Sequence, residues 1–228
     1  MGRIQGWLKM VRILCWRLMW LGPSLGKGFK EESIPKDAGG NPDLSYFLEG
    51  PEYYFRMCQD YYSLLGNAKG LSAEHLKRAY SRRVYGTWGL IAKGQSSLPY
   101  VHKLFALTVP EAREDAAGIV TALIGSKEPP ESMVRALIGA LEAATNSQER
   151  DSLVLALGRT KSRTAIRYLS EVLQQKVVDS DTCWTIIHAL EGISEQAFRE
   201  CGDPCAAALS WAKSYLLQNN CEQDKRLQ

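Results

Sequence analysis

The sequence of 228 residues contains little of what enzyme active sites usually need. It has three histidines, and none of them is followed by glutamate (His75, His102 and His188). It has no glycine-rich phosphate loop and no H-E-x-x-H string, so the residues that phosphate-loop and zinc-protease sites require are absent. We therefore predict a non-enzymatic protein with no catalytic residues, no cofactor and no metal site.

Cysteine is also sparse for a protein held together by disulfides or zinc. The chain has six cysteines, and a chain of this length buries a core without needing disulfides. Cys201 and Cys205 are separated by three residues, and no second pair matches them, whereas structural zinc requires four ligands. The pattern favours reduced thiols in a cytoplasmic protein.

Acidic residues are absent from the first 30 positions. This segment carries six bases and no acid, although the whole chain has a net charge of only +3. The remaining residues therefore sum to a mildly negative charge. Because phosphate binding requires a basic surface, nucleic acid is an unfavourable partner for this larger part of the chain.

The basic start of the chain has the pattern of an amphipathic helix. A helical wheel for residues 3–21 places Trp7, Leu14 and Leu18 on one arc, and Arg12 and Arg17 on the opposite half. The segment is too short and too charged for a confident membrane span.

Three interpretations of residues 1–21 stay open. The segment can lie in a membrane interface through the five residues named above, giving peripheral membrane contact. It can be an organelle presequence, or it can be a helix that docks on the rest of the protein. Residues 22–43 are rich in glycine and proline and are expected to form a flexible linker.

A repeat becomes visible beyond about residue 78. Leu90, Leu123, Leu157 and Leu190 follow one another at spacings of 33, 34 and 33 residues. A small residue precedes each of them, and apolar residues recur three and four positions before. Each copy is followed by a short break and a second amphipathic stretch, which predicts stacked helix pairs.

The repeat resembles HEAT-like proteins, in particular the short bacterial form found in phycobilin lyase subunits. That form reads V-R-x-x-A-x-x-A-L-G, and residues 149–158 read ERDSLVLALG while residues 82–91 read RRVYGTWGLI. The other two copies carry Ala116 and Cys183 at the arginine position. The resemblance implies that Arg83 and Arg150 hold neighbouring repeats together.

The predicted fold is all-α. It consists of a right-handed α-solenoid of about four to five HEAT-like helix hairpins over residues 44–218, preceded by the basic amphipathic helix and followed by a polar tail, 219–228. In such solenoids the second helices line the concave surface. Positions two and five before the repeating leucines would form a row on it, and we expect that row to bind a protein or peptide partner. The row contains Tyr85, Trp88, Thr121, Leu155 and His188.

The leading functional hypothesis is thus a non-enzymatic scaffold or adaptor. One alternative is a lyase-like or chaperone-like subunit of the phycobilin lyase type. The other is nucleic-acid binding through the basic cluster at 77–83, where Lys77, Arg78, Arg82 and Arg83 alternate with tyrosine.

Overall fold

The computed structural model describes residue 36 and residues 43–65, 71–124, 129–175 and 180–226. Within these ranges the chain is helical and contains no strand, which confirms the prediction of an all-α fold. The chain divides into two compact units, Met1–Ala92 (unit 1) and Lys93–Gln228 (unit 2). The basic segment 1–21 lies outside the described residues.

Unit 1 contains a short 3-10 helix η2 (Leu44–Tyr46) and the helices α2 (Pro51–Leu65) and α3 (Ala73–Ala92). Proline at the first position of α2 suits a helix start, because its missing N–H needs no partner there. At the start of α3 the amide of His75 donates to Ser72 Oγ at 3.3 Å, so Ser72 caps this helix.

Helices α2 and α3 pack so closely that glycine is required between them. A Cβ atom on Gly89 would lie 2.2 Å from two ring carbons of Tyr54, and one on Gly86 would lie 2.6 Å from the Tyr54 carbonyl oxygen. The Tyr54 ring is fully buried and forms an edge contact with Tyr85 at a centroid distance of 5.7 Å. The two glycines therefore set the distance between the helices.

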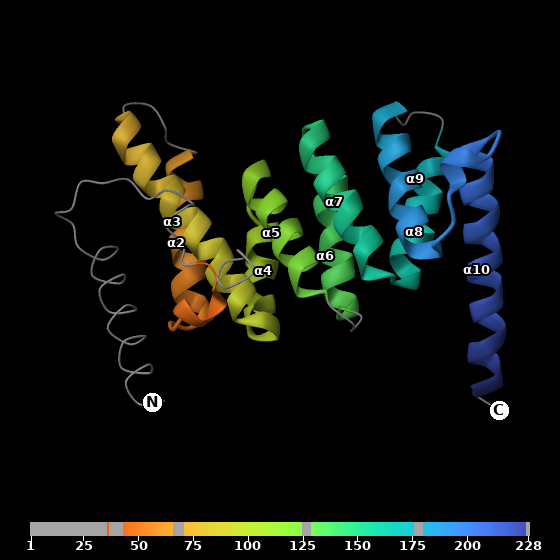
Figure 1. Ribbon diagram of the computed structural model, residues 1–228, viewed down its shortest axis with the longest axis horizontal. Coiled ribbons are helices and arrows are strands. Elements are labelled where there is room, and N and C mark those ends of the chain that lie inside the picture. The colour runs from red at the N-terminus through yellow and green to blue at the C-terminus, as the bar shows by residue number, and fades with distance from the viewer. Residues whose placement is uncertain (1–35, 37–42, 66–70, 125–128, 176–179, 227–228) are drawn as a thin grey trace. The chain divides into compact units, whose positions relative to one another are not determined.

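Unit 2 is a longer series of helices, shown in chain order in Figure 1. After the 3-10 helix η3 (Gly94–Ser97), its elements are α4 (Leu98–Phe105), α5 (Pro110–Leu123), α6 (Glu131–Glu142), α7 (Ser147–Thr160), α8 (Arg163–Gln174), α9 (Ser180–Ser194), η4 (Phe198–Glu200) and α10 (Pro204–Arg226). The predicted end of the last helix at residue 218 is wrong, because α10 continues to Arg226. Residues 219–226 are polar, but they contain no glycine or proline that would stop a helix.

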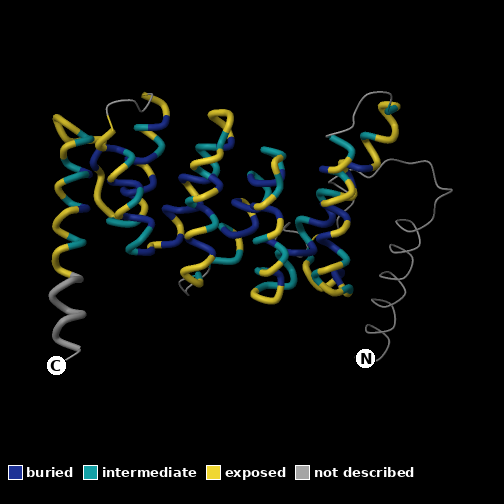
Figure 2. Tube along the Cα trace, turned by 180° about the vertical axis from the view of Figure 1, so that it is seen from behind, coloured by how far each residue is buried: buried dark blue, intermediate teal, exposed yellow. Residues whose placement is uncertain are grey.

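The helices of unit 2 pack as two rows. One row is α4, α6, α8 and α10, in which each helix contacts the next, and the other is α5, α7 and α9. Helices of different rows pair within the hairpins α4–α5, α6–α7 and α8–α9. Figure 2 shows buried segments where the two rows face each other, and the fully buried side chains there include Leu137, Leu157 and Leu169.

The burial pattern corrects the repeat register in α5. Leu153, Val154, Ala156 and Leu157 are buried in α7, and the residues 33 positions later are buried in α9. In α5, however, Ala122 is exposed and Leu123 is half-buried, while Ile119 and Val120 are fully buried. The structural equivalent of Leu157 is therefore Val120, about one helical turn before the predicted Leu123. A shift of one turn keeps an apolar face nearly in phase, so periodicity alone does not detect it.

The corrected register assigns a different residue to the repeat arginine of α5. The equivalent of Arg150 is Arg113, in place of the predicted Ala116. Arg113 is buried, and its Nε atom donates to Oε1 of the fully buried Glu149 at the start of α7. Its Nη1 atom also donates to Leu107 O at 3.0 Å, and Nη2 donates to Ala143 O at 3.4 Å.

This buried ion pair joins three parts of unit 2. Leu107 belongs to the α4–α5 connection and Ala143 to the α6–α7 connection, so one guanidinium bridges two turns and the next helix of its row. Oε2 of Glu149 accepts from the amide of Thr145 at 2.9 Å. An arginine in this register thus holds successive hairpins together, which is the role that the HEAT-like resemblance implies for Arg83 and Arg150.

Candidate functional site

The outer face of α5, α7 and α9, opposite the second row of unit 2, is the best candidate for a binding surface. We define this outer face by the residues of three helices that lie on the side away from the core: Glu111, Glu114, Asp115, Gly118 and Thr121 of α5; Gln148, Asp151, Ser152, Leu155 and Arg159 of α7; and Asp181, Trp184, Thr185, His188 and Gly192 of α9. None of these residues is buried. The helices position them because every third or fourth residue faces the same way.

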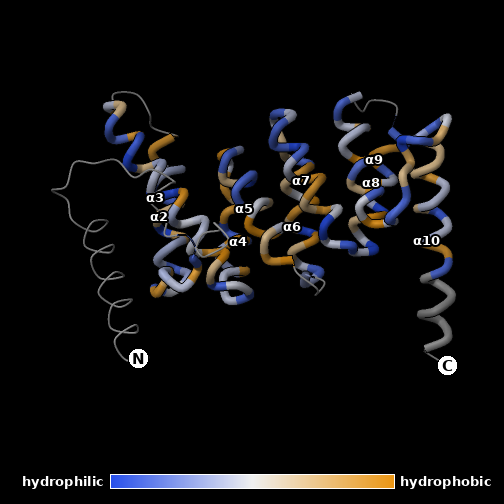
Figure 3. The backbone as a smooth tube through the Cα atoms, in the orientation of Figure 1, coloured by the Kyte–Doolittle hydropathy of each residue, from blue (hydrophilic) through white to orange (hydrophobic). Residues whose placement is uncertain are grey.

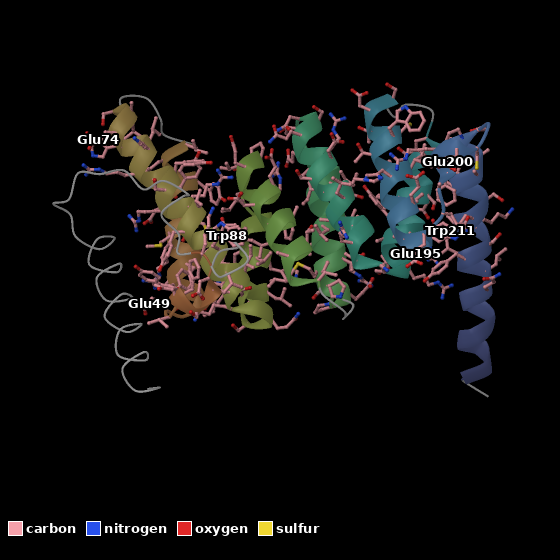
Figure 4. All side chains as sticks on the ribbon, in the orientation of Figure 1. Glu49, Glu74, Trp88, Glu195, Glu200 and Trp211 are labelled. Carbon is pink, nitrogen blue, oxygen red and sulfur yellow. The ribbon has the colours of Figure 1, made fainter. Side chains whose placement is uncertain are left out.

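Tyr85 was predicted to bind a partner, and this prediction is wrong. Its side chain is only 5% exposed and packs on Phe47 at a ring-centroid distance of 4.9 Å. Tyr85 therefore belongs to the aromatic core of unit 1. Trp88, one turn further along α3, is half-buried and is labelled in Figure 4. Both residues belong to unit 1, and the outer face belongs to unit 2.

The other three residues of the predicted row lie on the outer face. Leu155 is exposed, and His188 is exposed with its Nδ1 atom 3.6 Å from Oε2 of the buried Glu191. Thr121 is half-buried, and its hydroxyl donates to Ala117 O of its own helix at 2.9 Å. In the corrected register the α5 equivalent of Leu155 is Gly118, so Thr121 lies one turn away from the predicted place.

Trp184 is a surface residue that the sequence analysis missed. It is 49% exposed on α9, and Leu155 on the neighbouring helix α7 is 42% exposed. The two helices are in direct contact, and Asp151 accepts a hydrogen bond from the Thr185 hydroxyl at 2.8 Å between them. A large exposed indole could have been noticed on a helical wheel of residues 180–194, where it falls nearly opposite the buried Ile186.

The three helices that form the outer face are also the acidic row of unit 2. Helices α5, α7 and α9 together contain seven acids and three bases, whereas α4, α6 and α8 contain three acids and four bases. The five carboxylates of the outer face all lie in the first halves of their helices: Glu111, Glu114 and Asp115 in α5, Asp151 in α7 and Asp181 in α9. Figure 3 shows hydrophilic colour at the upper ends of α7 and α9, where these helices begin.

The pKa of Glu114 reports this concentration of negative charge. Partial burial raises the pKa above its usual value, and the neighbouring carboxylates of Glu111, Asp115 and Glu149 raise it further. A hydrogen bond from the Gln148 side-chain amide, 3.0 Å from Oε2, acts in the opposite direction. The ionised form of Glu114 is thus less favourable in the folded protein than in the unfolded chain.

We expect Glu114→Gln to stabilise the protein at neutral pH. Because the folded-state pKa is raised, ionisation of Glu114 destabilises the folded state above that pKa. This penalty is absent below the unfolded pKa near 4.5, so the advantage of glutamine should disappear there. Thermal unfolding of both proteins between pH 4 and pH 8 measures the difference. A glutamine variant that is less stable at pH 8, or whose advantage grows on acidification, would contradict the assignment.

The basic cluster at 77–83 is largely occupied by contacts within unit 1. Arg78 pairs with Glu74 at 2.7 Å, and Arg82 pairs with Asp60 of α2 at 2.8 Å. The Arg83 guanidinium lies over the Tyr61 ring at 5.4 Å and over the Tyr80 ring at 5.3 Å. These contacts lower the positive charge available to a phosphate backbone. Arg83 contributes to α2–α3 packing, whereas Arg150 is half-buried on α7.

The part of the chain that the structure describes has few features of other kinds of site. It contains no group of three or more metal-binding side chains. None of its helices combines the length and apolar character that membrane crossing requires. A recess between η3, α4, α5 and α6, lined partly by Leu98, Leu123 and Met133, has a volume of about 10 Å³, which is room for about one water molecule.

Two short strings of the sequence carry the letters of catalytic motifs. Residues 22–26 read GPSLG and residues 179–181 read DSD, so the letters of G-x-S-x-G and of D-x-D do occur. A nucleophile elbow requires a strand before its serine. The first string and Asp179 lie outside the described residues.

Comparison with known proteins gave no match. No family model matches the chain, and neither a curated protein nor a solved structure is similar enough to be reported. The structure shows an all-helical protein. Because a fold alone does not imply a function, the surfaces of the protein have to indicate what it does.

Proposed function

We propose that the protein is a non-enzymatic interaction module that binds a protein or peptide partner on the outer face of α5, α7 and α9. The observation that carries this proposal is the pair of exposed large apolar side chains, Leu155 and Trp184, on two helices in contact. A tryptophan on a surface is a frequent centre of protein-binding energy. An exposed apolar pair bordered by charged residues is typical of an interaction site.

The proposed architecture is a right-handed HEAT-like α-solenoid. The two rows of unit 2 and the recurring register of α7 and α9 support it, as does the Arg113–Glu149 pair between successive copies. In such an arrangement one row of helices presents a continuous surface to a partner. We assign that surface to α5, α7 and α9, and we assign the module to the cytoplasm, in keeping with the reduced thiols of Cys201 and Cys205.

The two alternative functions have less support. Nucleic-acid binding at 77–83 would have to use arginines already engaged by Glu74, Asp60 and two tyrosine rings. A lyase-like or chaperone-like role rests on the resemblance of the repeat alone. Bilin binding in solution would favour that role over a scaffold.

Affinity capture with matched variants tests the proposed function. We expect the double substitution Leu155→Ala and Trp184→Ala to reduce recovery of a specific partner by about tenfold or more, since interface centres contribute about 2 kcal/mol or more. The control is Leu217→Ala, which removes a leucine that is 58% exposed on α10. Quantitative mass spectrometry of the captured proteins gives the ratio. Equal recovery by the native protein and the folded double variant would exclude the outer face.

A further inference from the structure

One register position of the outer face carries a chemically distinct side chain on each of its three helices. The corrected register aligns Val120 of α5 with Leu157 of α7. In this register the equivalents of Trp184 in α9 are Asp151 in α7 and Glu114 in α5. We call these last three residues the outer strip. None of them is buried, so the strip presents two carboxylates and one indole on successive helices of one row.

The two carboxylates of the outer strip accept hydrogen bonds from neutral donors. The Gln148 amide donates to Glu114 at 3.0 Å, and the Thr185 hydroxyl donates to Asp151 at 2.8 Å. Partial burial and three neighbouring carboxylates raise the pKa of Glu114, so negative charges repel one another here. A cationic group of a partner would relieve this repulsion. The strip therefore favours a ligand that combines positive charge with an apolar group for the indole.

The spacing of the outer strip sets the spacing required in the ligand. A Cβ atom on Gly158 of α7 would lie 2.8 Å from the Cβ atom of Ala189 in α9, so these helices are in close contact. The axes of contacting helices lie about 8–10 Å apart. A chain in the polyproline II conformation has three residues per turn, and it places every third side chain on one face at intervals of about 9 Å.

The other side chains of the outer face favour this conformation over a bound helix. Gln148, Ser152 and Thr185 carry amide or hydroxyl groups on the same face, and none of these residues is buried. A polyproline II chain makes no internal hydrogen bonds, so its carbonyl groups are free to accept from such donors. A Cβ atom on Gly118 of α5 would meet nothing within 4 Å, which leaves room for a peptide backbone on that helix.

We propose that the outer strip binds a segment of a partner protein in the polyproline II conformation, with two bases and one apolar residue at every third position. The bases meet the carboxylates of Glu114 and Asp151, and the apolar side chain packs on the indole of Trp184. The inference rests on the proposed function, because it assigns a ligand chemistry to the same outer face.

Fluorescence anisotropy with the full-length protein and labelled synthetic peptides tests the proposal. The probe peptide carries arginine, arginine and leucine at every third position, separated by prolines that hold the polyproline II conformation, and it is made in both chain directions. The first control peptide has the same composition with the two arginines adjacent. The second is an alanine-based helical peptide with the same three residues seven positions apart. We expect one direction of the probe to bind about tenfold more tightly than either control.

Matched variants of the protein test the role of the two carboxylates. Glu114→Gln combined with Asp151→Asn removes both charges and keeps an oxygen that can accept each hydrogen bond. The control, Glu142→Gln combined with Glu171→Gln, removes two charges from exposed residues of α6 and α8. We expect the first variant to weaken probe binding by about fivefold or more, and the second by less than about twofold. Glu114→Gln alone should weaken binding while it stabilises the fold, which separates a lost ligand contact from unfolding.

Four results would overturn the proposal. They are equal binding of the probe and the first control, tighter binding of the helical peptide, an unchanged affinity in the variant that lacks both carboxylates, and no saturable binding of the probe up to about 1 mM. The proposed function fails separately, because it depends on capture through Leu155 and Trp184. A partner that needs these two residues but is insensitive to loss of both carboxylates would keep the proposed function and refute this ligand chemistry.

Discussion

Replacing Glu149 by glutamine is expected to destabilise unit 2 by about 3–5 kcal/mol, the usual cost of removing one partner from a buried ion pair. Glutamine keeps the shape of the side chain and can still accept from the Thr145 amide. It removes the charge that faces the Arg113 guanidinium, whose side chain is only 7% exposed and so has little access to solvent. The measurement is the free energy of unfolding from urea denaturation, followed by far-ultraviolet circular dichroism.

The control and a second variant separate charge from shape. Glu142→Gln on α6 changes an exposed glutamate and should alter stability by less than about 0.5 kcal/mol. Arg113→Met combined with Glu149→Gln should be less damaging than the sum of the two single changes, with a coupling of about 1–3 kcal/mol. Additive effects of the two substitutions would show that the pair does not stabilise the packing of successive hairpins.

Replacing Gly89 by alanine is expected to destabilise the α2–α3 pair by about 1–3 kcal/mol, the usual cost of overpacking a core. The new methyl group would lie 2.2 Å from two ring carbons of Tyr54, and that ring is fully buried and cannot move aside without disturbing Phe47 and Tyr85. Hydrogen exchange read by mass spectrometry should show faster exchange in α2 and α3.

Gly139→Ala is the matched control for this substitution. Gly139 is also a helical glycine, but a Cβ atom there meets nothing within 4 Å. Alanine should therefore stabilise α6 by about 0.5–1 kcal/mol through its higher helix propensity and slow exchange in that helix. The steric argument would be refuted if both substitutions changed exchange in the same direction.

The sequence predicts the local structure of this protein better than its tertiary contacts. Pro51 and Ser72 mark helix starts through local chemistry, and the structure places helices there. The register of α5 could not be predicted, because Ile119-Val120 and Ala122-Leu123 are both apolar pairs about one turn apart. The choice between them depends on Arg113 meeting Glu149, a contact across 36 residues of sequence.

The residues of the candidate site also differ in whether local sequence or a distant contact decides their exposure. Leu155 was predicted from its offset to the repeating leucine and is exposed on the outer face. Tyr85 has the same kind of offset, but Phe47 covers it, and no periodicity within α3 reveals a residue that comes from before α2. Trp184 was missed because the equivalent position in α7 is the acidic Asp151, so no repeated apolar signal marks it.

The row packing of unit 2 has a consequence for how this part of the protein folds. In unit 2, the helices that pack extensively on one another, from α4 to α10, lie no more than two places apart along the chain. Contacts between segments close in sequence need little loop closure, and proteins built from them fold quickly, in microseconds to milliseconds. Folding can begin at any hairpin and spread to its neighbours in both directions, so the order of events in unit 2 should depend on which hairpin is locally most stable.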